Sequence, residues 1–206
     1  MDEWLACLSR RCGQGLVDGS LIFERLCLNT RCMLEDRGFE VPAVGAATAK
    51  ARFLESQPIH TGEARDGRRV VLYIDSEERT GIKRVRQLME QHPDDIVVVS
   101  IDGVTPFTKK EVAHEARITF FVAKEVMHNL PRHCLVPRHT ALSQEEAEAV
   151  KKRFHMMDHH WMLLLSSDPV ARWYNWRIGT IVRIERTGLT QDTHVVYRKV
   201  VRAATG

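Results

Sequence analysis

Four cysteines have a spacing that could hold a metal ion. Cys7 and Cys12 form one C-x4-C pair, and Cys27 and Cys32 form another. The second pair lies in a stretch with helical periodicity, where five residues of rotation separate two side chains by roughly 140° at ~3.6 residues per turn. That angle disfavours shared ligation of zinc. The chain has five cysteines, an odd number that argues against a disulfide framework and predicts a reducing compartment.

Other reactive side chains lack the neighbours that catalysis needs. His155 and His159 would face one way on a helix, but a zinc-protease motif places Glu directly after the first His, and Met156 stands there. Cys134 lies in an apolar segment that we expect to be buried, so its thiol is expected to be inert. The chain contains no G-x-S-x-G nucleophile turn and no glycine-rich phosphate loop. We therefore predict no catalytic residue, no cofactor, no bound metal and no small-molecule substrate.

A cluster of aromatic and basic residues is the strongest candidate for binding. Trp173, Tyr174 and Trp176 stand among Arg172 and Arg177. Such a cluster can stack against the bases of a single-stranded nucleic acid. It can equally be an exposed apolar patch that docks a protein partner. The residues alone leave both alternatives open.

The elements around this cluster begin at clear helix signals. Ser143 and Glu146 form an S-x-x-E capping box, in which each side chain can bond a free backbone N–H at the helix start. Asp168 followed by Pro169 predicts a second helix start, with Asp as the N-cap and Pro at the first helical position. Gly179 ends that turn, and an apolar run after it predicts the first strand of a terminal hairpin.

The first half of the chain predicts an α/β domain. A helix is expected at about 20–37, with Gly38 at its C-terminal cap. Apolar strands at 69–75 and 96–101 flank an amphipathic helix at 81–92, which is the pattern of a parallel strand pair with a helical crossover.

Weaker signals complete this half. We expect residues 1–18 to be an extension with a short helix, and residues 57–68 to be a loop. Thr108 and Glu111 predict a capping box for a helix that begins at Lys109, and a strand is expected at about 125–130.

Charge is distributed unevenly along the 206 residues, whose formal net charge is +3. Residues 132–206 contain 12 Lys and Arg against 7 Asp and Glu, whereas residues 1–131 contain 18 against 20. A basic half indicates nearby nucleic acid, an acidic protein partner or simply a solvated basic face. The sequence contains no apolar run long enough to span a membrane, and the N-terminus does not resemble a secretory signal.

Four short motifs in a fixed order carry a family resemblance. L-V-P-x-H at 135–139 is followed by the capped helix, then by D-P-V-A-R at 168–172 and G-x-I-V-x-I at 179–184. This order resembles the shared fifth subunit of eukaryotic RNA polymerases, and the C-terminal part resembles the small archaeal counterpart of that subunit. The first half shows a weaker likeness to the same family in M-L-E-D-R-G-F-E-V, G-I-K-R-V and V-T-P-F.

The resemblance implies a fold and a division into domains. An N-terminal jaw domain with a restriction-endonuclease-like α/β fold would occupy residues 19–133, after an extension at 1–18. A small two-layer α/β assembly domain would occupy residues 134–206. The chain would be a non-catalytic subunit of a nuclear DNA-directed RNA polymerase. Its partners would be the largest subunit, other polymerase subunits and downstream duplex DNA.

The resemblance also implies which residues make these contacts. The expected polymerase-docking residues are His133, Val136, Pro137, His139, Asp168, Pro169, Arg172, Trp173, Tyr174 and Trp176. The expected DNA-proximal residues are Thr105, Pro106, Lys109 and Lys110. With this family in view, docking is the favoured role of the aromatic cluster.

Two alternatives remain beside this interpretation. A nuclease of the implied jaw fold would need an Asp and an (Asp/Glu)-x-Lys on adjacent strands to hold Mg²⁺. Asp75 could be the first ligand, but the 96–101 strand offers neither a carboxylate nor a lysine. A free-standing basic DNA-binding or transcription adaptor module is the other alternative, and it would not assemble with polymerase.

Overall fold

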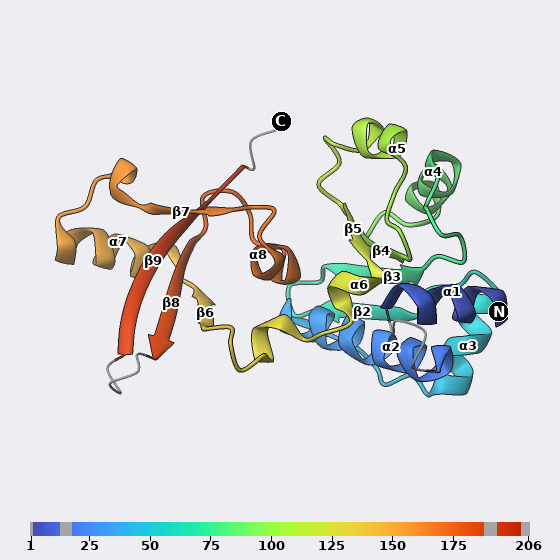
Figure 1. Ribbon diagram of the computed structural model, residues 1–206. Coiled ribbons are helices and arrows are strands. Elements are labelled where there is room, and N and C mark those ends of the chain that lie inside the picture. The colour runs from blue at the N-terminus through green and yellow to red at the C-terminus, as the bar shows by residue number, and fades with distance from the viewer. Residues whose placement is uncertain (1, 13–17, 188–192, 203–206) are drawn as a thin grey trace. The chain divides into compact units, whose positions relative to one another are not determined.

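The structure is a computed structural model that describes residues 2–12, 18–187 and 193–202. The chain divides into two compact units, Met1–Asn129 and Leu130–Gly206 (Figure 1). Each unit has its own sheet, and the mixed α/β class expected from the sequence is confirmed. Among the described residues, no helix is both long and apolar enough to cross a membrane.

The N-terminal unit is built on a five-stranded sheet. Its strands are β1 (Phe39–Glu40), β2 (His60–Ala64), β3 (Arg69–Ile74), β4 (Asp95–Ser100) and β5 (Ile118–Val122), and they lie in that order. The first three strands pair antiparallel, and β3, β4 and β5 pair parallel. Helix α4 crosses from β3 to β4, so the expected strand–helix–strand unit is confirmed.

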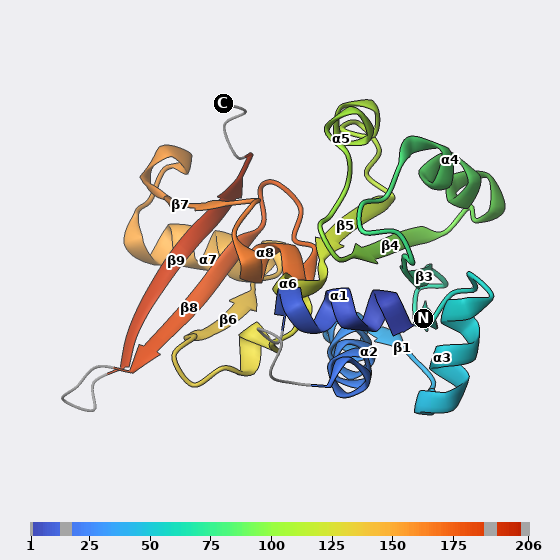
Figure 2. The same ribbon diagram turned by 45° about the vertical axis from the view of Figure 1, so that its right-hand side comes forward.

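Helices cover this sheet on two sides (Figure 2). They are α1 (Asp2–Cys12), α2 (Gly19–Asp36), α3 (Ala46–Leu54), α4 (Ile82–Gln91), α5 (Pro106–Glu111) and α6 (Ala123–Val126). On the α4 side, Val85 and Leu88 pack against alternate residues of the central strands, among them Val71 and Val98. The α1, α2 and α3 side buries a cluster of aromatic rings. Because both faces of the central strands are covered, these strands are apolar over residues 70–74 and 96–99.

Helix α1 belongs to the N-terminal unit, whereas we expected residues 1–18 to lie outside it as an extension. Trp4 and Leu8 are buried, and the Trp4 indole N–H donates to the carbonyl oxygen of Asp75 at 3.1 Å. Gly19 allows α2 to approach α1, because a Cβ there would lie 2.4 Å from the carbonyl oxygen of Leu5. The apolar face of α1 therefore packs against the end of the sheet that carries Asp75.

Part of the segment expected to be a loop at 57–68 is strand β2. Its inward positions are His60, Gly62 and Ala64, which alternate with exposed residues. Polar and small residues at buried positions hide the alternation of apolar side chains by which strands are usually recognised. The strand prediction for 125–130 was also wrong. The strand is β5, and Glu125 reaches back to accept the Val122 N–H at 2.9 Å, which starts helix α6 instead.

The C-terminal unit contains a four-stranded sheet in the order β6-β8-β9-β7. The strands are β6 (Arg138–Ala141), β7 (Met162–Leu165), β8 (Ile181–Thr187) and β9 (Thr193–Val201). The helices are α7 (Gln144–Phe154) and α8 (Pro169–Tyr174), with 3-10 turns η1 (Leu130–Arg132) and η2 (Asp158–His160). The expected terminal hairpin is confirmed as the antiparallel pair β8–β9, while β7 pairs parallel with β9 and lies at an edge.

Helices contact both faces of this sheet, whereas we expected two layers. On one face, Ala171 of α8 packs with Val182 and Val200. Tyr197 points to the opposite face because side chains alternate along a strand. Its ring lies 6.3 Å from the ring of Phe154 at the end of α7. Periodicity marks a helix as amphipathic but does not say which sheet face it will cover.

The capping box of α7 is confirmed. Ser143 Oγ accepts the Glu146 N–H at 3.2 Å, and the Glu146 carboxylate accepts the Ser143 N–H at 2.8 Å. The helix ends at His155, which has a left-handed backbone at φ 49°. His155 and His159 are therefore not on one helix, since His159 lies in the following 3-10 turn.

Candidate functional site

Helix α8 and its two caps position the aromatic cluster. Asp168 Oδ1 accepts the N–H of Val170 at 2.9 Å and that of Ala171 at 3.4 Å, and Pro169 occupies the first turn. The helix stops at Asn175, which adopts a left-handed backbone at φ 54°. The predicted Asp-Pro helix start is thus confirmed. The reversal at Asn175 then decides the direction of Trp176.

The three aromatic residues of the cluster occupy two different environments. Trp173 is only 1% exposed, so it is a core residue, although we expected it to present a docking surface. Tyr174 and Trp176 are both half-buried, and their rings stack with centroids 4.8 Å apart and planes 7° from parallel. Trp176 also packs against the apolar cluster of the sheet. The exposed edges of Tyr174 and Trp176 are therefore held rigidly.

The L-V-P-x-H segment extends this stack. His139 Nδ1 lies 2.6 Å from the carbonyl oxygen of Pro137, so this nitrogen carries the proton and donates it to the carbonyl. The His139 ring lies 6.4 Å from the Trp176 ring at an angle of 35°. His139, Trp176 and Tyr174 thus form a continuous row of rings, which we term the aromatic strip.

The turn before Pro137 is more exposed than the sequence suggested. His133 lies at the surface and accepts the Leu135 N–H on Nδ1 at 3.2 Å, while its carbonyl oxygen accepts the Val136 N–H at 2.9 Å. Cys134 is exposed, so its expected burial was wrong. Leu135 is 84% exposed. The apolar residues of this segment have the composition of a buried stretch, but the 3-10 turn η1 leads into a tight turn that directs them to the surface.

The residues that we expected to lie near DNA are on and before helix α5. Thr105 is the N-cap, its Oγ1 accepts the Thr108 N–H at 3.3 Å, and Pro106 stands in the first turn. The helix therefore begins three residues earlier than the predicted capping box at Thr108, which is buried. As a result, Lys109 and Lys110 lie exposed in the last turn rather than at the helix start.

The carboxyl ends of the parallel strands do not assemble a nuclease site. Asp75 follows β3 and is 6% exposed, and its Oδ1 accepts the Glu77 N–H at 3.3 Å. The only carboxylate of β4 is Asp95, which pairs with Val70 at the opposite end of the strands. Within the described ranges, no group of three His, Cys, Asp or Glu side chains is placed to hold a metal ion.

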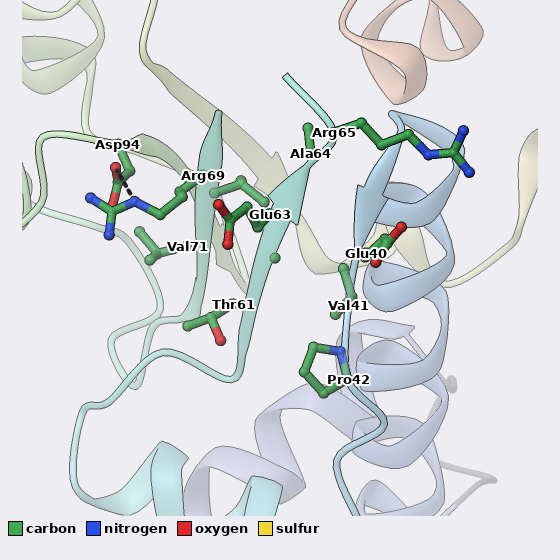
Figure 3. A pocket seen from close by; sticks show the side chains of 12 residues that line it. Glu40, Val41, Pro42, Thr61, Glu63, Ala64, Arg65, Arg69, Val71 and Asp94 are labelled. Carbon is green, nitrogen blue, oxygen red and sulfur yellow. Dashed lines mark hydrogen bonds and ion pairs between the residues drawn. The ribbon is translucent and has the colours of Figure 1, made fainter. Parts of the chain in front are cut away.

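An open groove of about 860 Å³ lies over β1, β2 and the start of β3 (Figure 3). Glu40 and Glu63 are directly opposite each other on neighbouring strands, and Arg69 pairs with Asp94 at 3.2 Å. Gly62 keeps β1 close, because a Cβ there would lie 2.9 Å from Val41. Carboxylates and guanidinium groups are interspersed along the groove, so it does not present the convergent polar groups of a small-molecule site.

The comparison with protein families identifies the C-terminal unit. Residues 128–200 match the family model described as the RNA polymerase Rpb5, C-terminal domain. The matched stretch covers the segment from η1 through most of β9, and so includes the aromatic strip. The chain carries an Rpb5 C-terminal domain. The resemblance to the fifth polymerase subunit is therefore confirmed for this part of the sequence.

Whole-protein relatives extend the likeness beyond the Rpb5 C-terminal domain. DNA-directed RNA polymerases I, II, and III subunit RPABC1 of Caenorhabditis elegans is 29% identical over 137 residues, covering 63% of this chain and 65% of the relative. The corresponding Dictyostelium discoideum subunit is 31% identical over 128 residues, covering 59% of this chain and 65% of the relative. The chain thus spans about 65% of the length of these relatives.

A viral relative matches a shorter stretch. The DNA-directed RNA polymerase RPB5 homolog of African swine fever virus is 35% identical over 75 residues, which is 36% of this chain and 37% of the relative. Identity is therefore higher over this shorter stretch than over the longer matches to the other relatives.

Proposed function

We propose that this chain is a non-catalytic subunit of a DNA-directed RNA polymerase and acts in the nucleus. It would assemble on the largest subunit through the C-terminal unit, and the N-terminal unit would be a jaw along downstream duplex DNA. The observation that carries the proposal is the Rpb5 C-terminal domain match over a compact structural unit. The names of the relatives, all polymerase subunits, point the same way. By resemblance, nucleotidyl transfer belongs to the large subunits.

The aromatic strip supports docking of the C-terminal unit on the largest subunit. Stacked rings held by helix caps lose little conformational freedom on binding, and Trp and Tyr are frequent anchors of protein interfaces. His133, Val136 and Pro137 shape the turn that leads to His139. Asp168 and Pro169 start α8, and Arg172 stands within that helix beside the strip. In this proposal the exposed residues of the set make the contact, and Asp168 and Trp173 hold its shape.

The test is affinity purification of the tagged full chain from cells in which it is expressed. The largest polymerase subunit should co-purify with the parent chain. Tyr174→Ala should reduce that recovery, because it removes half of the ring stack without emptying the core. Leu21→Ala, at an exposed apolar residue of the N-terminal unit, is the matched control. A parent chain that migrates alone on size exclusion, with no polymerase subunit attached, would instead support a free-standing module.

A contact with downstream DNA is the second part of the proposal. Lys109 and Lys110 are exposed at the end of α5, where the helix dipole does not attract phosphate, so the contact rests on their charge alone. Lys83 of the neighbouring helix α4 is also exposed, which widens the basic surface. Lysine–phosphate contacts do not read base edges, so binding should be independent of sequence.

Salt dependence measures this contact directly. Each phosphate contact that is lost should make the slope of log affinity against log salt shallower by ~0.9, so Lys109→Gln/Lys110→Gln should change it by up to ~1.8. The measurement is binding of assembled polymerase to a downstream duplex over a salt series. Lys152→Gln, at an exposed lysine of the C-terminal unit, is the control. Equal slopes for the double variant and the parent would contradict a DNA contact at α5.

A further inference from the structure

An exposed apolar edge strand distinguishes the C-terminal unit. Strand β7 has the sequence Met-Leu-Leu-Leu and lies at the end of the sheet order, where β9 is its one strand partner among the described residues. Met162, Leu163 and Leu165 are 56%, 60% and 49% exposed, while Leu164 is buried against Val200. Proteins normally protect such an edge with charged residues, proline or a bulge. Strand β7 has neither a charge nor a proline.

The backbone of β7 leaves hydrogen-bonding groups directed away from the sheet. The Ser166 N–H donates to the Val201 carbonyl at 2.8 Å, and in a parallel ladder the residues that bond a given neighbour alternate. The N–H groups of Leu163 and Leu165 therefore point outward. Among the described residues, the outward carbonyl of Leu163 receives a 3.4 Å contact from the Arg198 guanidinium, and that of Leu165 accepts the Asp168 N–H at 2.9 Å. The backbone carbonyls of an extended chain could accept hydrogen bonds from the outward N–H groups of Leu163 and Leu165.

The charge around β7 selects the kind of chain that would bind. Residues 132–206 carry 12 basic and 7 acidic residues, and Arg198 and Lys199 stand on the strand next to β7. A second copy of this chain would bring two basic units together, which costs free energy through like-charge repulsion. An acidic segment would be attracted to the same surface. An acidic partner segment is thus favoured over self-association.

We propose that the free edge of β7 receives an extended segment of a partner polymerase subunit as a fifth strand of the sheet. This inference rests on the proposed polymerase function and names the surface that serves it. The segment would be apolar at alternate positions, to cover Leu163 and Leu165, and acidic where it passes Arg198. Its backbone would bond the outward N–H groups of β7, as in other cases of strand addition.

Paired substitutions separate the backbone bond from the side-chain contact. Leu163→Pro and Leu163→Ala both shorten the side chain, but only proline removes the outward N–H. That N–H takes no part in the ladder with β9, so the sheet keeps its bonds. Parent and variant chains with different tags are co-expressed, and their ratio in purified polymerase is measured. The ratio for Leu163→Pro should be roughly tenfold lower than that for Leu163→Ala, because one buried partner carbonyl loses its donor.

Hydrogen exchange of the unaltered chain gives a second measurement that does not depend on how the proline variant folds. In the free chain, the amides of Leu163 and Leu165 should exchange rapidly. In the assembled polymerase they should be strongly protected.

The outcomes are distinct. Equal incorporation of the proline and alanine variants, together with unprotected β7 amides in the polymerase, would overturn strand addition and leave the polymerase function standing. Failure of the parent chain to enter polymerase would overturn both. A dimer of the parent chain that Leu163→Pro converts to monomers would assign the β7 edge to a second copy, contrary to the inference.

Discussion

The N-cap of α8 gives a quantitative test of how the aromatic strip is held. The Asp168 carboxylate accepts two N–H groups that open the helix, from Val170 and Ala171. Asp168→Ala removes both bonds at once. Val170 and Ala171 are buried, so water has little access to the amides that are left without a partner. The cost should therefore fall in the upper half of the range for lost N-caps, about 1–2 kcal/mol.

This cost converts into a large shift of melting temperature. For a domain of 60–100 residues, ~1 kcal/mol lowers the midpoint by ~4–8 °C, so Asp168→Ala should lower it by about 5–15 °C. The assay is calorimetry of residues 130–206, checked against the full chain. Asp168→Asn is the matched control, because Asn caps helices about as well as Asp. Ser167→Ala, at the exposed neighbouring residue, should leave the midpoint unchanged.

Two results would refute this reasoning. An unchanged midpoint for Asp168→Ala would mean that the cap contributes nothing to the stability of the unit. A fall as large for Asp168→Asn as for Asp168→Ala would mean that the negative charge matters and the hydrogen-bond acceptor does not. In the expected case, weakened docking by Asp168→Ala would follow from loss of the α8 geometry, without direct contact of Asp168 with the partner.

Three further predictions address burial. Trp173→Ala should cost ~3–5 kcal/mol and unfold the C-terminal unit by circular dichroism, whereas Tyr174→Ala should keep the spectrum. Burial lowers the pKa of His60, which is neutral in the fold with Nε2 bonded to the Cys27 carbonyl at 2.8 Å. In the unfolded chain the imidazole of His60 has a pKa of ~6.5. Its contribution to the free energy of unfolding is therefore complete above that pH and is lost as the pH falls toward the lower pKa of His60 in the fold. His60→Gln should therefore flatten the decline in urea melts between about pH 7.5 and 5.5. Burial raises the pKa of the Cys27 thiol to about 12, so a maleimide should label exposed Cys134 first and reach Cys27 only on unfolding, as peptide mapping would show.

Local helix signals in the sequence predicted the parts of the C-terminal unit that are fixed by nearest neighbours. Ser143, Glu146 and Asp168 bond backbone groups within three residues of themselves, so their pattern alone determines the geometry. The βαβ unit of the N-terminal half was equally accessible, because its strands are buried on both faces and contain continuous apolar runs at 70–74 and 96–99.

Elements whose identity depends on distant contacts were not accessible in the same way. The burial of Trp4 depends on contacts with α2 and the end of β3, which its own neighbours in the sequence do not reveal. Strand β2 was missed because the polar residue His60 stands at a buried position, where its ring bonds a carbonyl of α2. In the opposite sense, the apolar run of β7 has the composition of a buried strand, but the sheet order leaves it at an edge. Sequence gives the chemistry of these segments, and topology gives their exposure.

The aromatic strip shows how one backbone angle separates a core residue from a surface residue. Trp173 and Trp176 are three positions apart, a spacing that on a continuous helix would place them on one face. The helix ends between them, because Asn175 takes a left-handed backbone and the Trp176 N–H bonds the Ala171 carbonyl at 3.1 Å. Trp176 thereby leaves the helical register and stacks on Tyr174 instead of following Trp173 inward. Asn tolerates this conformation better than most residues other than Gly. The candidate docking surface therefore depends on the C-cap of α8 as much as on the aromatic residues that form it.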